Sequence, residues 1–176
     1  ISNRSASDII SVAKSGAGTW VLAGANTYTG ATTISAGVLL LNGSLASNSA
    51  VTVRTSGTLG GVGVANGALT VYGGGAISPA GSSSVGALTA GGVTWSNTGS
   101  YTFEIADAAG PAGSGHDLLA IAGSGSLNIK STSGSPFTVN LVSLNGSAPG
   151  LAANFIDTAA YAWPLAVAGS GGILNF

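Results

Sequence analysis

The sequence predicts an all-β fold, a β-solenoid of short stacked strands, on three observations: a repeat of 18 to 20 residues, abundant glycine and very few charges. Of the 176 residues, 30 are glycine and 5% are charged, and neither Cys nor Met occurs. Amphipathic helices need charged side chains at helical spacing on their solvent side. A chain with so few charges is therefore not built of long helices.

Four similar units define the repeat. They begin at residues 32, 50, 68 and 87, and each is followed by a glycine and a second short strand, over residues 37–41, 57–60, 75–78 and 92–95. A period this short excludes propeller blades, and the leucine-rich template is missing. Each unit therefore forms one coil of a solenoid, in which every strand pairs in parallel with its equivalents above and below.

Alternation within the strands predicts which side chains form the core. Val51 and Val53 flank Thr52, as expected for a strand with one face buried. The residues expected to point inward are Ile34, Val51, Val53, Leu69, Val71 and Leu88. At this period the chain holds roughly eight or nine coils and spans about 40 Å.

The chain reads as one domain over residues 1–176, with regular coils over 1–98 and less regular coils and an end region over 99–176. Further strands are expected over residues 101–105, 118–121, 127–129, 137–144 and 172–176. Residues 149–163 show no clear alternation and predict an irregular crossing or one short helical turn.

One long motif adds a family resemblance. Residues 16–30 read GAGTWVLAGANTYTG, and Thr32-Thr33-Ile34, Leu39, Leu41 and Asn42-Gly43 follow. This stretch resembles the autotransporter-associated β-strand repeat of large bacterial surface proteins. The resemblance is clear over residues 14–130 and looser over 137–176. It implies a right-handed parallel β-helix, displayed outside a Gram-negative-type bacterium.

Composition excludes two classes of partner. The net charge is −1 and only four residues are basic, so the chain lacks the positive footprint that nucleic acid requires. No apolar run approaches the roughly 20 residues that span a bilayer, so this segment is not expected to insert into a membrane. The sequence starts with Ile1-Ser2-Asn3 rather than Met, which suggests a processed or excised piece.

Few residues offer chemistry. His116 is the only histidine, so no site with two imidazoles forms within one chain. Residues 113–119 approach the calcium-binding nonapeptide, which makes Asp107 and Asp117 a candidate calcium site. The alternative is that Asp117 caps a turn by accepting backbone N–H bonds. We expect no cofactor, no metal and no catalytic residue. An enzyme would need an exposed acidic pair on one face.

Aromatic residues leave glycan binding open. An exposed ring can stack on a sugar, and the rings that could do so if exposed in a row are Trp20, Tyr28, Tyr72, Trp95, Tyr101, Tyr161 and Trp163. Trp95 and Tyr72 are the leading candidates for contact with surface glycans. A structural ladder or an end plug is the alternative role for such rings.

The leading functional prediction is a non-enzymatic extracellular scaffold, either a stalk or a fibre subunit; the alternative is an adhesin module of an autotransporter-like protein. The first and last coils expose unpaired strand edges. The predicted partner is a second copy, stacked head to tail through these ends. The end residues are Ile9, Ile10, Val12, Ile173, Leu174 and Phe176.

Overall fold

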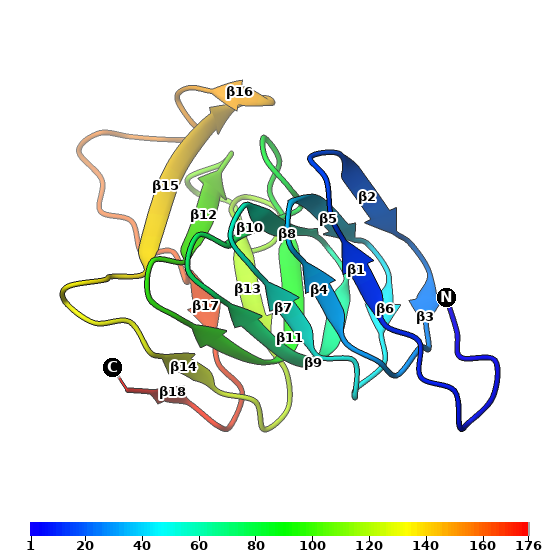
Figure 1. Ribbon diagram of the computed structural model, residues 1–176. Helices are drawn as coiled ribbons and strands as arrows, with labels where there is room; N and C mark the ends of the chain where they lie inside the picture. The colour runs from blue at the N-terminus through cyan, green and yellow to red at the C-terminus, as the bar shows by residue number, and fades with distance from the viewer. Residues whose placement is uncertain (176) are drawn as a thin grey trace.

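A computed structural model describes residues 1–175, which form a right-handed parallel β-helix with no helical segment. The strands lie on three faces of the solenoid, which the chain visits in the order first, second, third (Figure 1). The first and third faces belong to one 11-stranded sheet, and the second face forms a separate 7-stranded sheet. The predicted fold class is therefore confirmed.

The strands stack in a fixed order on each face. The first face holds β1 (Val12–Lys14), β4 (Thr32–Ile34), β7 (Val51–Val53), the second half of β9 (Val64–Val71), the second half of β11 (Ala87–Trp95), β14 (Leu127–Ile129) and β18 (Ile173–Leu174). The second face holds β2 (Thr19–Leu22), β5 (Gly37–Leu41), β8 (Gly57–Gly61), β10 (Ala76–Pro79), β12 (Ser100–Ile105) and β15 (Thr138–Asn145), and β16 (Ala148–Pro149) pairs antiparallel with β15. The third face holds β3 (Ala25–Asn26), β6 (Ser44–Leu45), the first halves of β9 and β11, β13 (Leu118–Ile121) and β17 (Ala166–Val167).

The coils start regular and then lengthen. Val12 pairs with Thr32, Thr32 with Val51 and Val51 with Leu69, which are steps of 20, 19 and 18 residues. Later partners on the same face are Val93, Leu127 and Ile173, after steps of 24, 34 and 46 residues. The described residues therefore make six coils and begin a seventh. The expectation of eight or nine coils and about 40 Å is wrong, and six inter-coil spacings give about 29 Å.

The fourth predicted unit is also out of register. Leu69 pairs with Val93, whereas Thr89 and Ala90 pair with Val64 and Ala65 on the third face. Leu88 still points inward, with none of its surface exposed. The cause is the loop over residues 80–86, which lengthens the chain between β10 and β11 and places Gly81 beside the Leu40 side chain of β5. Residues 87–90 and 92–95 alternate alike, so local pattern does not reveal which run continues the stack.

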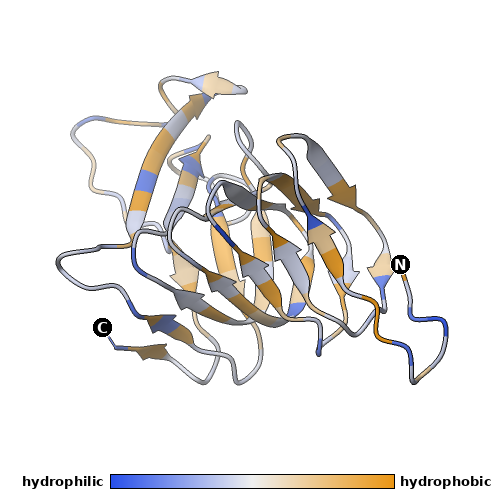
Figure 2. Cartoon of the chain, viewed as in Figure 1, coloured by the Kyte–Doolittle hydropathy of each residue, from blue (hydrophilic) through white to orange (hydrophobic). Residues whose placement is uncertain are grey.

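Inward rows of apolar side chains build the core. Leu39, Leu59, Ile77 and Tyr101 follow one another along the second face and are fully buried. Figure 2 shows hydrophobic residues alternating with polar ones along the strands, and hydrophilic residues gathered in the loop before β1. The inward positions predicted from alternation are all buried, with exposures of 0 to 1%.

Close contact between coils explains one corner glycine. A Cβ built on Gly43 would lie 1.9 Å from the carbonyl oxygen of Gly24 in the coil before it. No side chain fits in that space. At Gly37 the requirement is conformational, because its φ is 66° and glycine adopts this region at least cost.

Candidate functional site

Two acidic residues of the C-terminal half, Glu104 and Asp117, form a buried cluster. Asp117 has no exposed surface, and its Oδ1 accepts a hydrogen bond from the Gly86 N–H (2.8 Å) while Oδ2 accepts one from the Glu104 N–H (3.0 Å). The Asp117 N–H in turn donates to the Glu104 carbonyl (2.9 Å). One carboxylate thus ties loop 80–86 to the end of β12. This is the capping role that the sequence offered as the alternative to calcium.

Burial raises the pKa of both carboxyl groups of this cluster. Burial raises the pKa of Asp117 to about 7, against the lowering effect of its two backbone donors, and the nearby Glu104 raises it further. The pKa of Glu104 is also raised, mainly by burial. Glu104 is 3% exposed, and its Oε1 accepts a hydrogen bond from the Ser83 N–H (2.6 Å), while Oε2 is buried without a partner. An unpartnered oxygen of this kind favours the protonated acid.

The cluster does not form a nucleophilic site. His116 is 3% exposed, its Nδ1 lies 3.0 Å from the Asp117 carbonyl oxygen, and its ring packs against Phe103 at 5.5 Å. Ser114 is exposed and its hydroxyl lies near the Pro111 carbonyl instead. The imidazole therefore contacts neither a serine hydroxyl nor a carboxylate, which a catalytic triad requires.

Asp107, the other calcium candidate, has different partners. Its Oδ1 accepts hydrogen bonds from the Ala109 N–H (3.0 Å) and the Asn154 side-chain amide (2.8 Å), and these bonds lower its pKa. Over residues 1–175 no group of three or more His, Cys, Asp or Glu side chains is arranged to hold a metal ion. Asp107 and Asp117 thus serve two separate hydrogen-bond networks.

The predicted assembly residues at the N-terminal end differ in how far their side chains are exposed to solvent. Ile9 is 74% exposed, Ile10 is half-buried against the core, and Val12 lies inward in β1. A buried polar side chain also lies inside the first coil. The Lys14 ammonium is buried and donates to the carbonyls of Gly16 (2.7 Å) and Ala36 (2.9 Å).

A further polar inward residue lies on the third face. The Asn26 side chain donates to the Gly24 and Ser44 carbonyls and accepts from the amino group of Ile1. Residues 1–10 also accept bonds from the Thr27 and Gly30 N–H groups. The N-terminal end is therefore partly closed by polar groups, although the Trp20 side chain on β2 remains 51% exposed.

The C-terminal end is apolar. Ile173 and Leu174 lie in β18 and are 52% and 45% exposed, while Phe176 lies outside the described residues. A pocket of about 260 Å³ opens here, lined by Trp95, Leu127, Ile129, Leu165, Ala166 and Ile173. β18 belongs to the seventh coil, whereas β15 is the second-face strand of the sixth coil. If β1 of a second copy paired with β18, the β2 strand of that copy would therefore not reach β15. A gap as wide as one strand would remain between them on the second face.

The two glycan candidates have different surroundings. Trp95 is 7% exposed and stacks on Phe137, with ring centroids 4.5 Å apart and planes 3° from parallel. The small exposed part of Trp95 lies in the pocket at the C-terminal end. Tyr72 is 47% exposed, and the Arg54 guanidinium lies 5.8 Å from its ring centroid.

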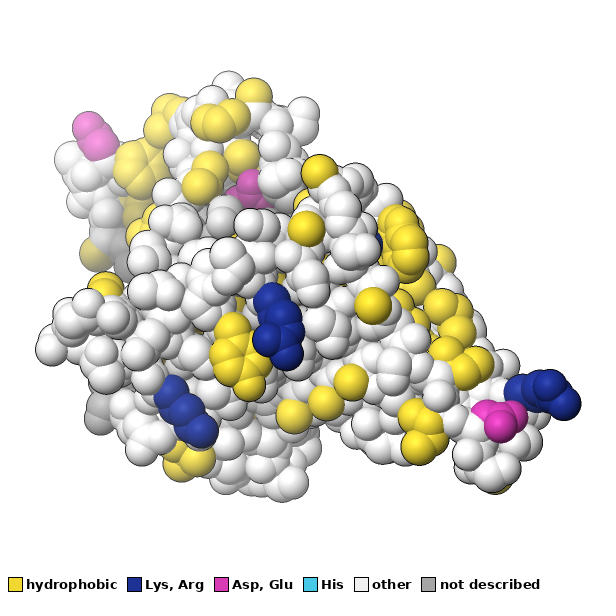
Figure 3. Space-filling model, viewed as in Figure 1, with side chains coloured by type: hydrophobic (Ala, Val, Ile, Leu, Met, Phe, Trp, Pro, Cys, Tyr) yellow, Lys and Arg dark blue, Asp and Glu magenta, His cyan; other side chains and the backbone are white. Residues whose placement is uncertain are grey.

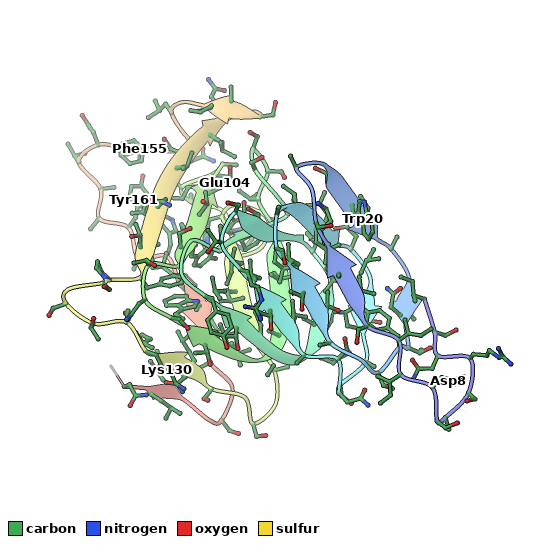
Figure 4. The ribbon with its side chains drawn as sticks, in the orientation of Figure 1. Asp8, Trp20, Glu104, Lys130, Phe155 and Tyr161 are labelled. Carbon is green, nitrogen blue, oxygen red and sulfur yellow. The ribbon has the colours of Figure 1, made fainter. Side chains whose placement is uncertain are left out.

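Three aromatic side chains stack on one another, and the sequence did not predict this stack. Phe155, Tyr161 and Trp163 stack in that order in the irregular segment after β16, with centroid distances of 5.6 and 5.1 Å. Figure 4 shows Phe155 and Tyr161 in the irregular segment that runs alongside β15 in this view. The rings are spaced unevenly along the chain, so no periodic signal marks them.

Comparison with known proteins gives one family finding. No curated protein matches the chain. Residues 12–41, which include β1, β2, β3, β4 and β5, match the passenger-associated-transport-repeat. This match confirms the predicted likeness to autotransporter passengers and implies a bacterial protein that is secreted or surface-exposed. The matched residues cover the first coil and the start of the second, and further coils of the same solenoid follow them.

Proposed function

We propose that this chain is a non-enzymatic spacer, a rigid β-solenoid segment of a passenger-type protein on the outer surface of a Gram-negative-type bacterium. The observation that carries the proposal is the unbroken parallel ladder through six strands of the second face. Each coil buries its apolar row against the next, so stiffness and length follow from coil number. The repeat match supports export and surface exposure.

The surface chemistry supports a structural role. Among residues 1–175, no helix is long and apolar enough to cross a membrane. Figure 3 shows few charged side chains, scattered over the visible face rather than gathered in a cleft. The neighbouring carboxyl groups of Glu104 and Asp117 are buried and accept hydrogen bonds from backbone N–H groups. The repeat family is not known as an enzyme family.

Duplication of one coil tests the spacer role. A second copy of residues 32–50 inserted after Ala50 keeps the register, because Thr32 pairs with Val51. Two such insertions are expected to lengthen the particle by about 10 Å, since each coil adds about 4.8 Å. Small-angle scattering measures the length, and a thermal melt reports whether unfolding stays cooperative.

The matched control places a flexible insertion of equal length in the exposed loop after Gly134, where no atom lies within contact of an added Cβ. This variant is expected to leave the rod length unchanged. The spacer proposal fails if coil duplication unfolds the chain or leaves its length unaltered. Hydrolysis or cleavage of polysaccharides by the purified chain would contradict the non-enzymatic part.

A further inference from the structure

The aromatic stack in the segment after β16 is anchored at one end and open at the other. Trp163 packs against the core, and its Nε1–H donates to the Ala108 carbonyl (3.1 Å). Tyr161 stacks on Trp163 with an angle of 9° between the planes, and Phe155 stacks on Tyr161 at 19°. The three rings thus form a short column that rises from the core.

Hydrogen bonds hold the middle ring. The Tyr161 hydroxyl accepts a bond from the Ile156 N–H (2.8 Å) and donates to the Asn154 carbonyl (3.1 Å). Asn154 itself has a φ of 54° and ties the segment to Asp107 through its side-chain amide. The rings therefore lose little further freedom when something binds them, which favours affinity.

The outer ring presents an open apolar face. Phe155 is 42% exposed although Tyr161 covers one side of it, so the opposite side faces solvent. An aromatic face is a surface on which the C–H side of a pyranose packs.

Acceptor groups belong to the residue before Phe155 and to its hydrogen-bond partner Asp107. Asn154 directly precedes Phe155 and bonds to the Asp107 carboxylate, whose pKa is lowered so that it stays ionised near neutral pH. The bonds from Ala109 and Asn154 both go to the Asp107 Oδ1 atom, and the Gly110 N–H also stabilises the carboxylate. The other side-chain oxygens are Oδ2 of Asp107 and Oδ1 of Asn154. Both are acceptors suited to hydroxyl donors, and a fixed negative charge disfavours an anionic ligand.

We propose that Phe155, Asn154 and Asp107 form a binding site for a neutral carbohydrate, in which one sugar ring extends the aromatic column and its hydroxyls donate to Asp107 and Asn154. The site goes beyond the spacer role and does not depend on it. It differs from the candidates Trp95 and Tyr72. A rigid aromatic face beside a few polar groups is the general form of a small-ligand site.

Titration with defined oligosaccharides tests the site. The probes are neutral tetrasaccharides of glucose, mannose, galactose and N-acetylglucosamine, with a galacturonate tetrasaccharide as the anionic comparison. Calorimetry and saturation-transfer NMR on the whole chain are expected to show binding of at least one neutral probe at millimolar concentration and none of the anion. Phe155→Ala is expected to weaken binding by about fivefold or more, and Phe155→Trp to retain it.

Two further variants separate binding from folding. Asp107→Asn preserves the shape of the side chain but removes the charge, and we expect it to weaken binding of the neutral probe. Ile156→Ala removes a similarly exposed side chain from the same segment and is the control expected to bind as the unchanged chain does. The proposal is overturned if no neutral probe binds the folded chain, if Phe155→Ala binds equally well, or if the anion binds preferentially. Rod length measured in parallel shows whether the spacer role stands independently.

Discussion

The buried Asp117 makes the stability of this protein depend on pH in an unusual direction. Its pKa in the folded chain is about 7, against 3.8 for a free side chain, with burial as the main cause. A carboxyl whose pKa is raised on folding stabilises the fold while it is protonated. That stabilisation is complete below about pH 4 and is lost as the pH rises through 7.

The size of the effect follows from the two pKa values. Between pH 5 and pH 8 the loss attributable to Asp117 is about 3 kcal/mol, which for a chain of this length corresponds to a Tm lower by about 6 to 12 °C. Glu104 adds to the loss in the same direction, because its pKa is also raised by burial. Urea unfolding at several pH values, followed by tryptophan fluorescence, measures the change.

Asp117→Asn supplies the comparison. The substitution removes the titration, but the new amide nitrogen cannot accept from one of the two backbone N–H groups. We therefore expect about 1–3 kcal/mol lower stability at pH 5 and a much flatter pH profile. Stability of the unchanged chain that is constant or rises between pH 5 and 8, or an equally steep profile in the variant, would refute the assignment.

Three further perturbations address the core, the corners and the ends. Leu59→Ala empties a fully buried inward position and should cost about 2–5 kcal/mol in chemical unfolding, whereas the outward Thr58→Ala should change stability by less than about 0.5 kcal/mol; equal effects would contradict the inward rows. Gly43→Ala forces a Cβ against backbone of the preceding coil and should lower the unfolding free energy by about 1–3 kcal/mol, so an unchanged urea midpoint would contradict the close approach. Head-to-tail association stays a prediction. The Leu127 N–H donates a hydrogen bond to the Gly172 carbonyl, so in this parallel pair the Ile173 N–H points to the free edge of β18. Ile173→Pro removes that donor and should abolish any concentration-dependent oligomers seen by ultracentrifugation while leaving the fold intact. A chain that is monomeric at high concentration, or oligomers unaffected by this substitution, would rule out stacking through β18.

Periodic features of the fold were predictable from the sequence. The alternation at Val51, Thr52 and Val53 repeats one coil later at Leu69, Thr70 and Val71, and these residues pair directly in the structure. Such a pattern is visible because each inward position repeats every two residues along a strand. The long motif over residues 16–30 likewise predicted the repeat that residues 12–41 match.

Polar residues in the interior were not predictable in the same way. Lys14 occupies an inward position in β1, and the alternation with Val12 already places it there, but a lysine is normally assigned to the surface. Its burial is tolerated because the ammonium group donates hydrogen bonds to the carbonyl oxygens of Gly16 and Ala36. Those acceptors come from two different coils, and their convergence is a property of the folded chain.

The candidate glycan site shows the same limit. The sequence offered seven aromatic residues for contact with sugars, Tyr161 and Trp163 among them, and favoured Trp95 and Tyr72; Phe155 was not included. Trp95 proves to be buried against Phe137, whereas Phe155 is half-exposed at the outer end of a column. Exposure depends on which segments pack over a ring, and residues far apart in sequence decide that.

The sequence by itself determined the fold class, the inward rows of the first coils and the repeat over residues 12–41, because these depend on local alternation and recur at short intervals. The tertiary structure decided the register after β10, the growth of the coils to 46 residues, and the contact of Asp107 with Asn154. The physical reason is that lengthening a surface loop costs little conformational entropy, so successive coils can contain very different numbers of residues. Side chains separated by such loops meet only where packing of the coils brings them together.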